Sequence, residues 1–198
     1  MAKVKFTKNE LKSQKDNLSR FNRYLPTLIL KKQQLQLEIR KVEQQMEERK
    51  TARLTVVDDV MSWVAVFGED VGFAQLIKVQ ALRSESGNIA GIDIPIFLGL
   101  DFGVVEYSLF AMPLWVDAAV NRVQEILALD AELAMLAEQV GRLGEELRIT
   151  TQRVNLFEKV KIPEAKDNIR MIQIYLGDQQ TAAVVRGKIA KNKLVKVS

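Results

Sequence analysis

The sequence predicts a mainly α-helical protein, in which a long antiparallel two-helix coiled-coil hairpin carries a small α+β insert at its bend. Two observations support this fold class. Apolar residues recur every three, four or seven positions near both ends of the chain, which is the spacing of a coiled-coil seam. Between the two seams the spacing falls to two and glycines become frequent, which indicates short strands. We therefore expect an N-terminal helix at 1–56, an insert of short helices and a β-hairpin at 57–115, and a C-terminal helix with a basic tail at 116–198.

The N-terminal helix should begin near Thr7 or Asn9, because either side chain can cap a helix. Pro26 lies inside the apolar pattern, but the pattern keeps its phase across the proline. We therefore expect one continuous, kinked helix rather than two. Gln14 and Lys32 are polar exceptions on the seam, and such residues usually fix register at a cost in stability. The apolar seam consists of Leu11, Leu18, Phe21, Leu25, Leu28, Leu35, Ile39, Val42 and Met46.

The insert should begin with one or two short helices, since the segment after residue 51 combines short amphipathic pieces with Trp63, Phe67 and Phe73. A β-hairpin should follow, with strands near 89–97 and 103–109 and a turn around 99–101. Pro95 lacks the backbone N–H that a strand ladder needs, so its strand is expected at an edge.

The C-terminal helix should begin between Pro113 and Asp117. A second apolar repeat around Pro163 is offset from the first, which predicts an irregular supercoil there. If the lysine-rich segments 1–15 and 186–198 lie side by side in an antiparallel hairpin, the numbers of facing residues should add to about 190. Leu28 would then face Ile162, and Met46 would face Leu143. The first seam consists of Ile126, Leu129, Leu133, Leu136, Val140, Leu143, Leu147, Val154 and Phe157, and the offset repeat of Ile162, Ala165, Ile169, Ile172 and Leu176.

Composition removes several kinds of chemistry. The 198 residues include no cysteine and no histidine, which excludes disulfides, the usual zinc sites, cysteine nucleophiles and imidazole acid–base catalysis. The sequence has no phosphate-binding loop, dinucleotide fingerprint or nucleophile elbow. Asp58 and Asp59 are adjacent on an expected helix, where neighbouring side chains face different ways. We therefore expect no catalytic residue, no cofactor and no metal.

Charge and hydropathy bear on location and partners. No apolar run approaches the roughly 18 residues that a membrane span needs, and no signal peptide is evident, so we expect a soluble, cytoplasmic chain. Nucleic-acid binding through the two basic ends is one alternative. However, these ends offer mainly lysine, without the interleaved aromatic residues and arginines that such binding favours. Solvated, mobile ends are the simpler interpretation.

The segment 150–176 resembles the C-terminal signature of the D subunits of the vacuolar and archaeal-type rotary ATPases. The middle segment 87–97 is similar to a strand of the same family through Asn88, Gly91 and Pro95. The order of long helix, small insert and long helix also agrees with that family. The signature positions, which the resemblance implies as partner contacts, are Arg153, Val154, Asn155, Glu158, Ile162, Pro163, Asn168 and Ile169.

This resemblance implies a central rotor shaft, a non-catalytic subunit of an ATP-driven ion-translocating complex that lies on the cytoplasmic side, peripheral to the membrane. The implied partners are the catalytic and non-catalytic ATPase head subunits, a small central-stalk subunit and a membrane-side coupling subunit above the rotor ring. Neither nucleic-acid binding nor direct membrane insertion is implied. A free-standing coiled-coil adaptor or holdase would show similar seams, so that alternative stays open, as does nucleic-acid binding through the termini.

Overall fold

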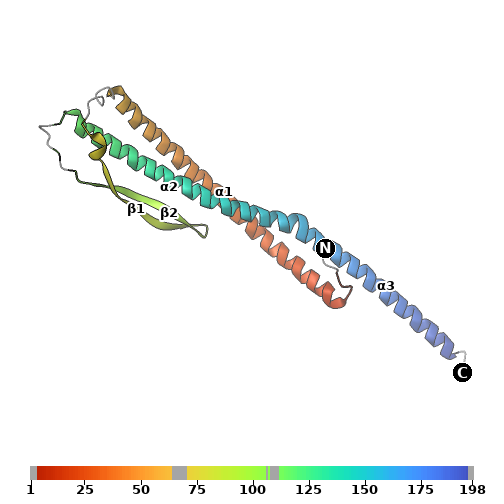
Figure 1. Ribbon diagram of the computed structural model, residues 1–198. Coiled ribbons are helices and arrows are strands. Elements are labelled where there is room, and N and C mark those ends of the chain that lie inside the picture. The colour runs from red at the N-terminus through yellow and green to blue at the C-terminus, as the bar shows by residue number, and fades with distance from the viewer. Residues whose placement is uncertain (1–3, 64–70, 106, 108–111, 196–198) are drawn as a thin grey trace. The chain divides into compact units, whose positions relative to one another are not determined.

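The computed structural model describes residues 4–63, 71–105, 107 and 112–195. The described chain is mainly helical and contains a two-stranded antiparallel sheet, which confirms the predicted class; the coiled-coil hairpin itself stays a prediction. The elements in chain order are α1 (Lys8–Trp63), the 3₁₀ turn η2 (Phe73–Gln75), β1 (Lys78–Ile89), β2 (Ile92–Gly103), α2 (Trp115–Leu156), the π-helical turn η3 (Phe157–Lys161) and α3 (Ile162–Val195). Figure 1 labels the long helices and the two strands.

The chain divides into two compact units. The terminal unit combines Met1–Lys32 with Ile149–Ser198, and the central unit is Gln33–Arg148. Both long helical stretches therefore contribute to both units. The three-part division at residues 56 and 115 stays a prediction.

Helix α1 begins as the sequence predicts. The Thr7 hydroxyl accepts a hydrogen bond from the Glu10 N–H (3.2 Å), and the Thr7 carbonyl accepts one from the Leu11 N–H (3.0 Å), which is the pattern of an N-cap. The helix continues through Pro26 to Trp63, seven residues beyond the expected end. Pro26 cannot donate to the carbonyl of Asn22, but Asn22 is exposed and water can satisfy that carbonyl.

In the terminal unit, α1 runs antiparallel to η3 and α3. The rings of Phe21 and Phe157 have their centroids 5.2 Å apart, and those of Phe6 and Tyr175 are 5.1 Å apart. The residue numbers of both contacts add to about 180. The predicted total of about 190 is therefore wrong by roughly ten residues. In consequence α3 continues well past the start of α1, and the two basic ends do not face each other.

The part of α3 that lies beyond this contact has little packing. From Gly177 to Lys193 every side chain is exposed except that of Ala182, which is partly buried. Val184, Val185 and Ile189 are about half exposed or more. Gly177 lies inside the helix.

The π-helical turn η3 lies immediately before Pro163. The Ile162 N–H donates to the Phe157 carbonyl five residues earlier, in place of the usual partner four residues earlier. Pro163 has no N–H, and in a regular helix its ring would crowd the carbonyl of Lys159. A wider turn at this point relieves that conflict. The irregularity that the sequence places near Pro163 thus takes the form of a π turn.

The central unit has a core shared by three elements. Leu35 and Val42 of α1, Ile94 of β2, and Leu136 and Leu143 of α2 are buried together, and Met46 packs against this cluster. The hairpin therefore contributes to the packing between the helices. All predicted seam residues of both helical stretches are buried or partly buried. A second cluster joins Leu76 to Val116 and Val120 near the start of α2.

The β-hairpin is displaced along the sequence from its predicted place. Its turn is formed by Ala90 and Gly91, whose φ values of 54° and 82° define a two-residue turn of the primed type. Asn88 supports this turn by accepting a hydrogen bond from the Gly91 N–H (3.0 Å) and donating one to the Asp93 carboxylate (2.9 Å).

The predicted strand at 89–97 coincides with β2 only at residues 92–97, whereas the turn predicted at 99–101 is wrong because those residues lie inside β2. The strand predicted at 103–109 is not found among its described residues after Gly103. Gly99 lies within β2, beside a register irregularity opposite Arg83. After Gly103 the described residues 104, 105 and 107 belong to no strand, and residues 106, 108 and 109 lie outside the described residues.

The predicted short helices of the insert are found only in part. Phe73–Gln75 forms a 3₁₀ turn, whereas residues 78–83 are already in β1. The expected helical position of Phe67 lies outside the described residues.

Strand β2 is bound to α2 along its outer edge. Gln139 donates to the Pro95 carbonyl (2.6 Å), and Arg142 donates to the Asp93 carbonyl (2.9 Å). Gln139 and Arg142 lie three residues apart, so they share one face of α2. Because Pro95 cannot donate to a neighbouring strand, its strand suits an edge, as predicted. These two side chains satisfy carbonyls that an edge strand otherwise leaves to water.

Candidate partner-contact site

The eight signature residues follow one another through the end of α2, the π turn η3 and the start of α3. In the structure some of these side chains face the packed interior and the others face solvent. Val154, Ile162 and Asn168 are buried with 6 %, 9 % and 8 % exposure, and Ile169 is partly buried. The other four, Arg153, Asn155, Glu158 and Pro163, are exposed. The signature is therefore half a packing surface and half a solvent-facing surface.

Two apolar side chains belong to the solvent-facing half, and the sequence reasoning missed them. Leu156 is 44 % exposed and Val160 is 48 % exposed. They lie four residues apart and off the apolar seam, which is the signal that could have identified them. Below, the outer turn surface means the exposed residues Arg153, Asn155, Leu156, Glu158, Val160 and Pro163.

The chemistry of the outer turn surface suits binding to another protein. It combines two exposed apolar side chains with a cation, an anion and an amide, the mixture found in non-obligate protein interfaces. Nearby, Lys161 and Glu164 form an ion pair at 3.0 Å, and both side chains remain more than 40 % exposed. That pair is weak in water and can exchange for a partner's charges.

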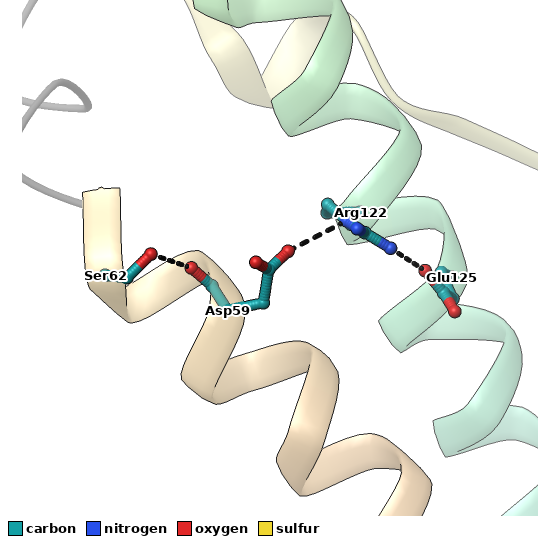
Figure 2. A network of polar contacts seen from close by, with 4 residues as sticks. All are labelled: Asp59, Ser62, Arg122 and Glu125. Atoms are coloured by element: carbon teal, nitrogen blue, oxygen red, sulfur yellow. Dashed lines mark hydrogen bonds and ion pairs between the residues drawn. The ribbon is translucent and has the colours of Figure 1, made fainter.

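In the central unit, charged side chains join α1 to α2. Arg49 pairs with Glu132 (2.9 Å), Arg53 pairs with Asp130, and Asp59 pairs with Arg122 (3.1 Å). Figure 2 shows Arg122 between Asp59 and Glu125, which is 3.0 Å from its guanidinium, and Ser62 donating to the Asp59 carbonyl (2.6 Å). As the numbers rise along α1 they fall along α2, so the two helices are antiparallel here.

These ion pairs are exposed or only partly buried, so each contributes little to stability. Their shared contribution is alignment, because each pair is satisfied at only one offset between the helices. The hydrogen bond to Asp130 raises the pKa of Arg53, and the hydrogen bond from Arg148 lowers the pKa of Glu145. The hydrogen bond to Asp117 raises the pKa of Tyr107. The first two shifts favour the charged form of each ion-paired side chain, and the third keeps Tyr107 a neutral donor to the Asp117 carboxylate.

Two other kinds of site, metal centres and membrane spans, have no candidate in the described chain. Within residues 4–63, 71–105, 107 and 112–195, His, Cys, Asp and Glu side chains nowhere gather in a group of three or more that could hold a metal. In the same described ranges, every helix is too short or too polar to cross a membrane.

Comparison of the sequence with known proteins places this chain in a family. A sequence model of the ATP synthase D subunit matches residues 10–192. The V-type ATP synthase D subunit of Borreliella burgdorferi is 48 % identical over 196 residues, which cover 99 % of this chain and 97 % of that protein. The corresponding subunits of Chlamydia caviae and Chlamydia muridarum are 32 % and 31 % identical, each over 98 % of this chain and over 94 % and 97 % of those proteins.

The fold and these full-length matches define the class as a subunit of an ATP synthase. The chain belongs to the ATP synthase D-subunit family, and the relatives compared above are subunits of V-type enzymes. The resemblance drawn from residues 150–176 is thereby confirmed. Membership in this family also means that other subunits of a complex are its partners.

Proposed function

We propose that this chain is the central-stalk rotor subunit of a V-type ATP synthase. It transmits torque between ATP hydrolysis or synthesis in the catalytic head and ion translocation in the membrane ring. The observation that carries the proposal is the full-length family match on a chain whose two long helical stretches run antiparallel in both units.

The packing supports a mechanical role. A shaft must resist twisting, and a helix pair with a shared core resists it better than a single helix. The central unit supplies such a core around Leu35 and Leu143, which are both fully buried. Interhelical ion pairs flank that core and oppose sliding. ATP chemistry takes place on the head subunits in this proposal, and the chain itself is non-catalytic.

The proposed partners are the catalytic and non-catalytic head subunits, a small central-stalk subunit and a membrane-side coupling subunit above the rotor ring. The proposed location is the cytoplasmic side of the membrane, peripheral to it, without direct insertion. The outer turn surface is proposed as one contact with these partners. Within the signature, Val154, Ile162, Asn168 and Ile169 then act indirectly, by setting the shape of the helix that carries the exposed residues.

A rotation assay tests the proposal directly. The chain has no cysteine, so Ser84→Cys on exposed β1 introduces a single attachment point. A bead on this thiol in the intact complex, with the head fixed to a surface, should rotate when ATP is added. A bead that stays fixed while the same complexes hydrolyse ATP contradicts a rotor role. The isolated chain, freed from all partners, should show no ATP hydrolysis.

A second experiment tests the outer turn surface. Leu156→Asp with Val160→Asp places two charges on this surface without touching the buried seam residues. We expect affinity for the remaining complex to fall by about ten-fold or more, because a desolvated apolar contact is lost. The matched control is Leu37→Asp, an exposed leucine of α1. Equal losses for both variants contradict a specific contact at the π turn.

A further inference from the structure

The terminal unit contains a polar pocket in an otherwise apolar helix contact. Its volume is about 140 Å³, and it lies between α1 and the η3–α3 stretch. Apolar side chains flank it along α3, where Ala165 is 3 % exposed and Ile172 is fully buried. The pocket is lined by Gln14, Asn17, Phe21, Lys161, Glu164, Ala165 and Asn168.

The amides in this pocket are short of partners within the described part of the chain. Asn168 is only 8 % exposed, and its amide makes no hydrogen bond to a described residue. Gln14 donates to Glu10 (2.8 Å) through its nitrogen, and its oxygen remains available to the pocket. Among the described residues, Thr150 Oγ1 is the only fully buried side-chain N or O atom without a partner, so the Asn168 amide still reaches solvent. A polar pocket of this size has room for several water molecules. Water bridging the amides therefore accounts for the pocket.

The rotation of α3 about its own axis also indicates that the Asn168 amide is held inward. Apolar periodicity predicts Ile169 on the inner face together with Ala165 and Ile172. The structure instead buries Asn168 more deeply than Ile169, which is only partly buried. Adjacent helical residues lie about 100° apart around the axis, so a rotation by a fraction of that angle would exchange the two. Some interaction therefore holds the amide inward against the apolar preference.

We propose that Gln14, Asn17 and Asn168 form a water-bridged polar pin, which fixes how α3 is rotated and aligned against α1 in the terminal unit. Gln14 and Asn17 lie three residues apart and share a face of α1, opposite Asn168. Sliding or rotating either helix would move an amide away from the water and against the Phe21 ring or Ile172. The pin specifies one alignment and lowers stability relative to an apolar layer, as buried polar residues do in helix pairs.

A double-mutant cycle on the full-length chain tests whether the amides act together. Gln14→Leu and Asn168→Leu each leave one amide facing a new leucine, so each should lower the midpoint of thermal unfolding by about 2–4 °C. The double variant removes the amides of Gln14 and Asn168. Asn17 is only partly buried, so water can satisfy its amide, and the double variant should unfold above the parent. The coupling should correspond to roughly a ten-fold change in the folded-to-unfolded ratio. Gln173→Leu, on an exposed face of α3, is the control for adding a leucine.

A distance measurement tests the alignment itself. Spin labels on Arg23→Cys and Lys159→Cys, both exposed, report the offset of α1 against η3 within the terminal unit. The parent should give one narrow distance distribution, and the double leucine variant a broader one or a second population. Additive effects of the two leucine substitutions overturn the proposal. A distribution that stays equally narrow in the double variant overturns it as well.

Discussion

At the scale of single residues, Ala90 has an unfavourable backbone conformation. Its φ of 54° lies in the left-handed region, where a Cβ atom crowds the backbone and glycine is preferred. Ala90→Gly should therefore raise the free energy of unfolding by about 0.5–1 kcal/mol, less the small contribution that its methyl group makes to the core. Urea unfolding followed by circular dichroism measures the change.

The matched control for Ala90 has the opposite expected sign. Ala134 is exposed inside α2, where glycine is unfavourable, so Ala134→Gly should lower the free energy of unfolding by about 1 kcal/mol. A loss of similar size in both variants would show that residue 90 is not strained.

Thr150 is a second residue with a measurable defect. Its side chain is 1 % exposed, and its hydroxyl oxygen is buried with no hydrogen-bond partner in the described residues. Thr150→Val keeps the shape and removes the unsatisfied hydroxyl, so the free energy of unfolding should rise by about 1 kcal/mol. Thr181→Val is the control, because the exposed Thr181 hydroxyl donates to the Gly177 carbonyl (3.1 Å) and loses that bond. If Thr150→Val is destabilising, an additional partner must satisfy that hydroxyl.

The sequence identified the buried residues of the helices well and the special residues poorly. Leu35, Val42 and Leu143 follow from apolar spacing alone, because a seam repeats every three or four positions. Asn168 was expected to matter only through family resemblance, since an amide carries no apolar signal. Nothing in the local sequence shows that Thr150 lacks a partner, because that depends on the atoms around it.

At the scale of elements, the attachment of the hairpin to α2 depends on a few contacts. Gln139 is 7 % exposed and donates to the Pro95 carbonyl, while Ile94 beside that carbonyl is 3 % exposed in the core. Gln139→Leu leaves the Pro95 carbonyl without its donor, so the hairpin should open more often. We expect amide hydrogen exchange in β1 and β2 to accelerate by about ten-fold, with little change in the centre of α1.

A control for that exchange experiment comes from the same helix. Gln152→Leu changes an exposed glutamine of α2 that lies in the terminal unit. Exchange in the hairpin should stay at the parent rate in this variant. Unchanged exchange in Gln139→Leu would mean that Ile94 and the turn alone hold the hairpin in place.

The position of the hairpin could not be read from the sequence for two physical reasons. Almost all of β1 is exposed on both faces, so it lacks the apolar–polar alternation that marks a half-buried strand. Its turn is Ala90–Gly91 rather than the Asn-Gly or Asp-Gly pair that usually signals a two-residue turn. The turn was predicted at Gly99 because glycine is typical of turns, but Gly99 lies within β2 beside a register irregularity.

At the scale of the whole molecule, the hairpin and the helices should contribute differently to function. Replacing β1 and β2 by a short flexible linker removes Ile94 from the shared core. Stability should fall by about 2–5 kcal/mol while the helical circular dichroism signal of the long helices is retained. Ion pumping by the reconstituted complex should be impaired, because in the proposed rotor role the insert is positioned to contact neighbouring subunits. A deletion variant that pumps at the parent rate contradicts this division of roles.

A charge in the core should disrupt the long helices themselves, which the hairpin deletion should leave folded. Leu35 is fully buried between α1, α2 and the hairpin. Leu35→Asp would bury an unpaired carboxylate, at a cost of several kcal/mol unless the helices separate. Helical content and assembly into the complex should both decrease, as measured by circular dichroism and co-purification. Normal assembly of this variant would show that the shared core is not needed for assembly into the complex.

The relative offset of the helices was the largest error at this scale. It came from placing the two basic ends together, an argument from net charge that involves no specific contact. The real offset is set by pairs such as Phe21 with Phe157 and Arg49 with Glu132, which cannot be identified before the fold is known. Family resemblance, in contrast, identified the class of the protein correctly because its motif spans nearly thirty consecutive positions, 150–176.

The exposed end of α3 has a consequence for how the chain survives in a cell. A helix without packing partners opens readily, and proteases cut chains that open. Arg186, Lys188, Lys191 and Lys193 lie in this stretch, so trypsin should remove the end of the free chain first. Assembly that covers the stretch would block those cuts. The exposed C-terminal helix would then direct proteases to unassembled copies. Mass spectrometry after brief trypsin digestion should show the shortened chain when it is free and the intact chain when it is in the complex.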